Sequence, residues 1–94
     1  MNRASILLSA QRAMLGNITP NMHAITVAYK DTEIVLRVYF INKPDEDDIE
    51  LMSEILTSMC SDFSEIINAK EEFFIIGNDK SKLICLNDWV FMQH

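Results

Sequence analysis

The stretch from Lys43 to Leu56, KPDEDDIELMSEIL, holds the densest group of side chains that could do chemistry. Four consecutive acids, Asp45 to Asp48, precede a helical pattern, and Glu50 and Glu54 follow. Two neighbouring carboxylates can work as an acid and base couple, but only where one of them is desolvated in a cleft. Because these acids stand at a hydrated helix start, we interpret them as a binding surface and not as a catalytic pair.

Other reactive side chains are few and scattered. His23 and His94 are far apart, and neither has the spacing to Cys or His that forms a metal site. The two glycines are too few for a phosphate-binding loop. Cys60 and Cys85 each sit in an apolar pattern, so we predict two reduced core thiols. We therefore predict a protein that is not an enzyme and that carries no metal or cofactor.

The charge of the chain is divided by region. The net charge is -6, but residues 45–72 hold ten acids against one base, Lys70, so this segment carries -9. The rest of the chain is therefore positive. An acidic surface repels a phosphate backbone and attracts a basic protein. We expect a basic protein as the partner and no direct contact with nucleic acid.

The length and composition predict one domain that spans residues 1–94. A chain of 94 residues that is 49% hydrophobic, with two Gly and two Pro, has the composition of a globular protein with a single core. The apolar run Ile6 to Leu8 is shorter than the ~7 to 15 residues of a signal-peptide core. No stretch approaches the ~20 apolar residues of a membrane span. We predict a cytoplasmic protein that does not contact a membrane.

Helical periodicity covers two segments, residues 3–15 and 46–62. Asp45 fits as the N-cap of the second helix, with Asp48 in the capping-box position. We expect the core to include one leucine of the first helix and several residues of the second helix and the strands: Leu8, Leu36, Val38, Leu56 and Met59.

Four strands follow from alternation and from short apolar runs. Residues 22–29 alternate, and residues 34–41 are apolar on nearly both faces, which is typical of a central strand. The turn KDTE joins the two segments and predicts a hairpin. Residues 73–76 and 89–92 are further apolar runs, and residues 83–86 fit the same ribbon. We predict an α+β fold of order α-β-β-α-β-β, with roughly four antiparallel strands and two helices on one face.

The acids of the second helix exceed what its start requires. An acid in the first turn gains about 0.3 to 1 kcal/mol from the helix dipole, and an N-cap contributes about 1 kcal/mol. Glu50, however, stands four residues from both Glu46 and Glu54, and like charges at this spacing cost about 0.2 to 0.5 kcal/mol per pair. Two explanations remain, solubility and recognition of a basic protein.

Several segments resemble one family of small proteins. AMLGNITPNMHAITVAY, LRVYF, the acidic DEDDIEL and SDF together resemble the CdiI-type immunity proteins of contact-dependent growth inhibition and related polymorphic toxin systems. The resemblance runs over residues 10–63 and returns faintly at WVFM. The chain departs from the family at residues 90–93, VFMQ, where relatives have a basic Val-Tyr-x-Arg-like strand.

The resemblance implies a protein that binds the toxic C-terminal domain delivered by a neighbouring cell and blocks it in the cytosol. Such a toxin is frequently a nuclease that acts on RNA, and a nuclease is usually cationic where it holds phosphate. The alternatives are a small acidic adaptor for another basic protein, and a homodimer joined at a sheet edge, so the free protein is expected to be a monomer or weak homodimer. The residues that we predict to face the toxin are Asp47, Asp48, Glu50 and Glu54, with Trp89 as a weaker candidate that could equally belong to the core.

Overall fold

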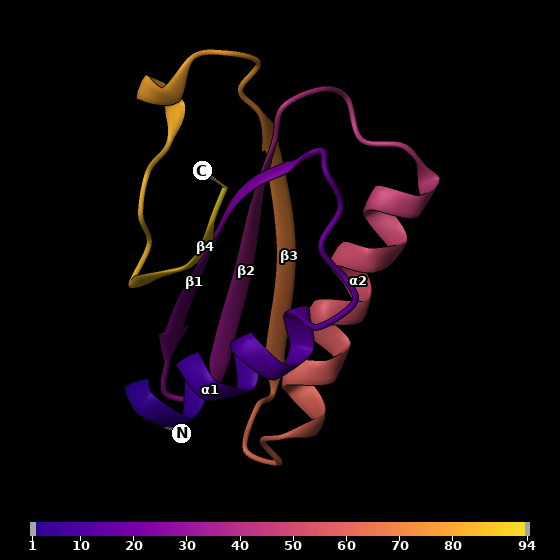
Figure 1. Ribbon diagram of the computed structural model, residues 1–94. Coiled ribbons are helices and arrows are strands. Elements are labelled where there is room, and N and C mark those ends of the chain that lie inside the picture. Colours follow the sequence, from indigo (N-terminus) through magenta and orange to yellow (C-terminus); the bar gives the residue numbers. More distant parts are fainter. Residues whose placement is uncertain (1, 94) are drawn as a thin grey trace.

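The computed structural model describes residues 2–93, which form two helices and a four-stranded sheet (Figure 1). The sheet has the strand order β3-β2-β1-β4. The predicted α+β class and the order α-β-β-α-β-β are confirmed. His94, considered above as a metal ligand, lies outside the described residues. The elements are α1 (Arg3–Met14), β1 (Met22–Lys30), β2 (Glu33–Phe40), α2 (Glu46–Ser61), β3 (Asn68–Ile75), the short 3-10 helix η1 (Lys80–Lys82) and β4 (Asp88–Met92).

The hairpin of β1 and β2 forms the centre of the sheet, and the predicted central position of the second strand is confirmed. Ile25 lies opposite Val38, and Val27 lies opposite Leu36 in the antiparallel pair. The turn between the strands places Asp31 at a φ of 54°, a left-handed conformation that aspartate tolerates better than most residues. These two strands therefore hold most of the buried apolar side chains of the sheet.

The prediction of an all-antiparallel sheet is wrong, because β3 runs parallel to β2. Glu33 lies opposite Asn68 at one end of the pair, and Phe40 lies opposite Ile75 at the other. A parallel pair requires a crossover connection, and α2 supplies it by carrying the chain from the end of β2 back to its beginning. β4 pairs antiparallel with β1 on the other side, so the sheet is mixed.

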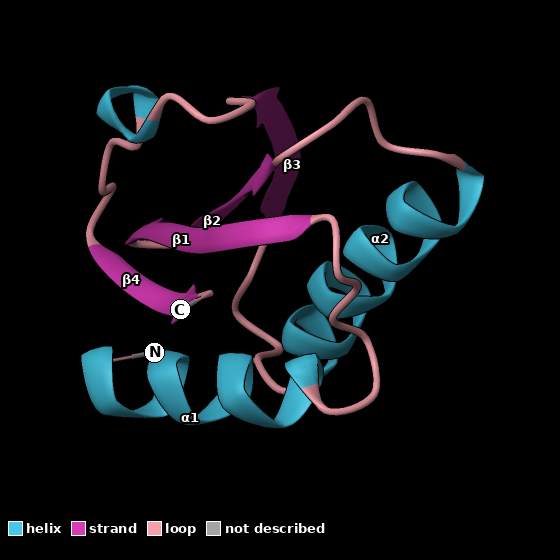
Figure 2. Ribbon diagram, turned by 45° about the horizontal axis from the view of Figure 1, so that its top comes forward, coloured by secondary structure: helices cyan, strands magenta, loops and turns pink. Residues whose placement is uncertain are grey.

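Residues 83–86, predicted to join the ribbon of strands, form no strand. Their backbone groups are bound by side chains of the sheet instead. The Ile84 amide donates to the Tyr39 hydroxyl at 3.1 Å, and the Leu86 amide donates to Thr26 Oγ1 at 2.9 Å. The segment therefore crosses one face of the sheet, opposite the helices (Figure 2).

The main core lies between the other face of the sheet and both helices, which confirms that the two helices share one face (Figure 2). Leu36, Val38 and Met59 are core residues, as predicted, whereas Leu56 is half-buried against the core. The largest fully buried side chains of this core are Ile6, Met22, Ile25, Ile34, Leu36, Phe40, Ile55 and Met59.

The predicted orientation of α1 is wrong: Leu8 is 57% exposed. The helix turns its small residues inward, and Ser9, Ala10 and Ala13 are buried. The Ser9 hydroxyl donates to Asp62 Oδ2 at 2.6 Å, so this buried polar group is satisfied at the end of α2. Small side chains let a helix approach its neighbours closely, which a search for large apolar residues does not detect. Cys60 and Cys85 are not joined in a disulfide, but Cys85 is exposed and Cys60 is half-buried, so the prediction that both thiols lie in the core is wrong.

Replacing Ile55 by Ala should lower the free energy of unfolding by about 2 to 5 kcal/mol, because a fully buried side chain is lost and a cavity remains. Leu8→Ala removes an exposed leucine and should cost less than about 0.5 kcal/mol. Urea denaturation of the two variants measures both values. Equal losses would contradict the orientation of the helices described above.

Candidate functional site

The start of α2 is fixed by Asp45, the predicted N-cap, and by Asp48, one of the predicted site acids. Asp45 Oδ1 accepts from the Asp48 amide at 2.8 Å, and Asp48 Oδ2 accepts from the Asp45 amide at 3.2 Å. The Asn21 side-chain amide donates to the same Asp48 oxygen at 3.0 Å. Asp48 is buried. Of the four acids predicted to face a partner, Asp48 is thus the one with a clear structural role, and it points inward.

The pKa of Asp48 reflects this environment. Burial alone raises the pKa of a carboxyl group, but hydrogen bonds from neighbouring donors, Asn21 and the Asp45 amide among them, outweigh burial and hold the pKa of Asp48 below its usual value. The ionised form is therefore the one that the fold stabilises.

Three more acids of residues 45–72 connect secondary-structure elements. Asp62, just after α2, accepts from Ser9 and lies 3.6 Å from the Arg12 guanidinium, so it ties α1 to α2. Glu71 of β3 accepts from the Ser53 hydroxyl of α2 at 2.6 Å. Glu72 pairs with Arg37 of β2 at 3.0 Å. The fold itself accounts for these charges.

Four acids of α2 remain without such a role. Glu46, Asp47, Glu50 and Glu54 are exposed, and none of their side chains has a hydrogen bond or an ion pair within the described part of the chain. Helical spacing places all four on the solvent side of α2, opposite the buried Met52, Ile55 and Met59. We call these four residues the acidic face. The structure thus brings together Asp47, Glu50 and Glu54 of the predicted set.

Trp89 lies apart from the acidic face. It is half-buried on β4 and belongs to a small cluster with Ala24, Tyr39 and Ile76, on the side of the sheet opposite the helices. Its ring centroid is 6.0 Å from that of Tyr39. Trp89 therefore helps to pack the segment that crosses this face of the sheet.

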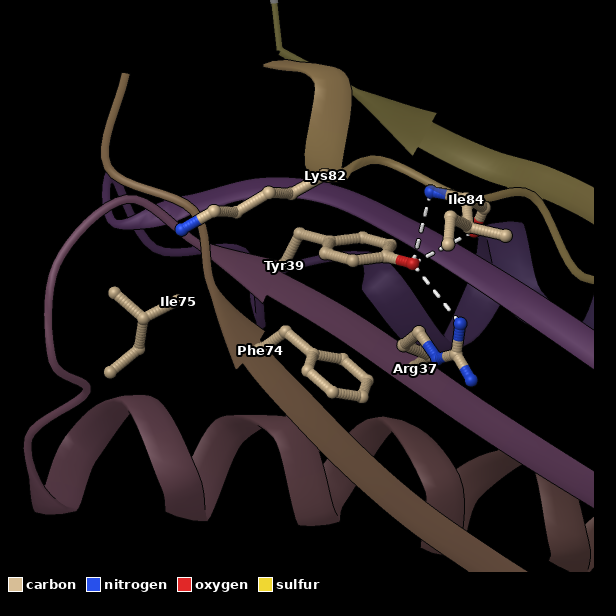
Figure 3. A pocket seen from close by; sticks show the side chains of 6 residues that line it. All are labelled: Arg37, Tyr39, Phe74, Ile75, Lys82 and Ile84. Carbon is tan, nitrogen blue, oxygen red and sulfur yellow. Dashed lines mark hydrogen bonds between the residues drawn. The ribbon is translucent and has the colours of Figure 1, made fainter. Parts of the chain in front are cut away.

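A pocket on the same face escaped the sequence analysis (Figure 3). It measures ≈ 380 Å³ and is lined by Arg37, Tyr39, Phe74, Ile75, Lys82 and Ile84, which we call the aromatic pocket. The sequence signal was the spacing of Arg37 and Tyr39, since residues two apart in a strand share a face. The partners on β3 and on the later loop are distant in sequence and give no such signal.

The Tyr39 hydroxyl organises the aromatic pocket. It donates to the Ile84 carbonyl at 2.8 Å and accepts from the Ile84 amide and from Arg37 Nη1, both at 3.1 Å (Figure 3). The Arg37 guanidinium carbon lies 5.0 Å from the centroid of the Phe74 ring. These contacts hold Phe74 and Ile84 at the surface, where they are 48% and 61% exposed. Four of the six lining residues are apolar or aromatic and two are cationic, and the lining contains no histidine, cysteine or carboxylate.

The described residues 2–93 contain no cluster of three or more His, Cys, Asp or Glu side chains that could hold a metal ion. None of the described helices is both long and apolar enough to span a bilayer.

Comparison with known protein families gives a match over nearly the whole chain. A family model described as MafI2 immunity protein matches residues 3–94. No curated protein matches the sequence.

Replacing Asp48 by Asn should lower the free energy of unfolding by about 1 kcal/mol at pH 7, because the capping carboxylate is lost. The folded-state pKa of Asp48 is depressed, so its contribution is present above the unfolded pKa of about 3.9 and is lost as the pH falls through the folded pKa. The difference between wild type and variant should therefore be constant near neutral pH and shrink below about pH 4. Urea denaturation at pH 7, 5 and 3 tests this; a difference that grows on acidification would contradict it.

Replacing Tyr39 by Phe should free the segment that crosses the sheet, because both backbone groups of Ile84 lose their partner. The Ile84 amide should exchange with solvent faster, and the protein should lose about 1 to 3 kcal/mol of stability. Tyr29→Phe is the matched control, since the Tyr29 hydroxyl donates to Asp88 instead. Unchanged exchange at Ile84 in the Tyr39 variant would show that the hydroxyl does not hold this segment.

Proposed function

The chain belongs to the MafI2 immunity protein family, and from this premise we propose that it neutralises its cognate toxin by binding it through the acidic face of α2. Family membership supports an immunity protein of a polymorphic toxin system and the binding of a toxin, in preference to an adaptor for some other basic protein. The observation that carries the proposed site is the lack of any partner for Glu46, Asp47, Glu50 and Glu54 within the described residues.

The acidic face lowers the stability of α2 in the isolated protein. Glu46, Glu50 and Glu54 follow each other at intervals of four residues, and such like-charged pairs destabilise a helix by about 0.2 to 0.5 kcal/mol each. The capping box already uses Asp45 and Asp48, so the first turn does not need Glu46 or Asp47 as caps. A basic partner would turn this repulsion into attraction, and concentrated charge raises the rate of association with such a partner.

The proposed toxin is a nuclease, and an RNase is favoured. A protein that holds a phosphate backbone presents Lys and Arg side chains at its active site or beside it. Carboxylates that pair with these side chains occupy the place of phosphate, so binding alone would block the reaction. The immunity protein needs no chemistry of its own in this mechanism, and the compartment that we propose for it is the cytoplasm, where the toxin would reach RNA.

The assignment to the contact-dependent growth inhibition type, suggested by the resemblance of residues 10–63, is finer than the family match. We retain it as a proposal about the delivery route of the toxin. The neighbouring reading frame would test it, since that route predicts a toxin domain behind a long secretion module.

Replacing Asp47, Glu50 and Glu54 together by Ser, Gln and Gln should slow association with the toxin about tenfold or more while the fold stays intact. The fold should survive because these side chains have no internal partner and their removal relieves repulsion. Stopped-flow mixing with the purified toxin domain measures the rate, and growth of cells that make the toxin measures protection.

A charge-matched control is available outside α2. Asp31→Asn, Glu33→Gln and Asp79→Asn together remove the same number of charges from the hairpin turn, the start of β2 and the loop after β3. This variant should associate within about twofold of wild type if position matters more than net charge. Equal rates for wild type and the α2 variant, with full protection, would move the interface away from the acidic face.

A further inference from the structure

The two edges of the sheet are protected very differently. β4 is five residues long, and its pairing with β1 contains a register shift between Ile25 and Thr26. β3 is eight residues long and pairs with β2 without any shift. Short edge strands, bulges, prolines and charges are the usual means of preventing a second chain from pairing with an edge. The charges of β3 lie at residues 70–72, so its last three residues, 73–75, are open to pairing.

The open end of β3 is also apolar on both sides of the sheet. Phe73, Phe74 and Ile75 are 41%, 48% and 44% exposed. Phe73 lies toward the helix side, where its ring packs edge-on against Phe40, and Phe74 lies toward the aromatic pocket, where its ring stacks with Tyr39. An added strand would therefore bury apolar surface on both of its faces.

The backbone direction of β3 can be deduced from its bonds to the hairpin. The amides of Asn68 and Ile76 donate to the carbonyls of Thr32 and Phe40. Backbone groups alternate in direction along a strand, so the even-numbered residues between them point to β2. The outward-pointing amides and carbonyls belong to Ala69, Glu71, Phe73 and Ile75.

The charge around this edge indicates what can pair with it. Ser53 of α2 lies beside Glu50 and Glu54 on the helix and donates to Glu71 of β3, so the acidic face borders the edge. A second copy of the chain would bring two acidic faces together, each on a molecule of net charge -6. A basic protein would meet attraction at the same place. The edge and the acidic face thus fit one and the same occupant, the toxin.

We propose that β3 accepts an extended segment of the toxin as a fifth strand, and that an apolar side chain of this segment enters the aromatic pocket beside Phe74. This inference rests on the proposed function and adds the mode of binding. Backbone hydrogen bonds from the outward groups of β3 supply affinity, and the pocket selects an apolar residue at alternate positions of the added strand. The carboxylates of the acidic face then attract basic side chains of the toxin that flank this segment.

The test separates the backbone from the side chain at one position. Ile75→Ala removes the exposed side chain, whereas Ile75→Pro removes the side chain and the outward amide without touching a bond to β2. The proline variant should bind the purified cognate toxin domain about tenfold more weakly than the alanine variant, because a toxin carbonyl loses its donor. Equal affinities would overturn the added strand.

Hydrogen exchange of the wild-type protein gives a second readout that does not depend on a variant folding. The amides of Glu71, Phe73 and Ile75 should exchange quickly in the free protein, because they point away from β2, and binding of the toxin domain should protect them. The amides of β4 should not gain protection. Fast exchange at the three β3 amides in the complex, or their protection in the free protein through a dimer, would overturn the proposal.

These outcomes differ from failure of the proposed function. If wild-type protein does not bind the toxin domain at all, the function itself is wrong. If it binds, and the acidic-face variant associates slowly while the β3 amides stay unprotected, the function stands and only the added strand is wrong.

Discussion

The parallel pairing of β3 with β2 is the constraint on which the rest of the structure depends. A chain that leaves one end of a strand can pair in parallel with it only after returning to the other end, and α2 makes that return. The helix consequently lies along the sheet, with one side in the core and one side in solvent. The same connection leaves β3 at the edge of the sheet, next to the solvent side of α2.

Nine of the ten acids of residues 45–72 fall into two groups in this arrangement. Asp45 and Asp48 begin α2, and Asp62, Glu71 and Glu72 connect α1, α2, β3 and β2. The four residues of the acidic face take no part in this network within the described chain. If the acidic face binds the toxin as proposed, stability and recognition use different carboxylates, and recognition can be changed without loss of the fold. That separation is what an immunity protein needs if its partner varies while its architecture stays the same.

Local patterns predicted the parts of the fold that local physics determines. The capping box of Asp45 and Asp48, the hairpin and the limits of both helices follow from residues close together in sequence. The direction of β3 depends on a crossover, so a short apolar run could not reveal it. Residues 83–86 look like a strand, but the buried hydroxyls of Tyr39 and Thr26 capture two of their amides. The same long-range contacts build the aromatic pocket, which is why the acidic face was predictable and the pocket was not.

The crystal structure of the complex with the cognate toxin domain tests the central claim most directly, because it shows which carboxylates meet the partner. We predict that basic side chains of the toxin lie within ion-pair distance of the acidic face, and that Asp48 keeps its bonds to Asn21 and the Asp45 amide. A complex in which the toxin contacts only α1 and β4, with the acidic face open to solvent, would contradict the account.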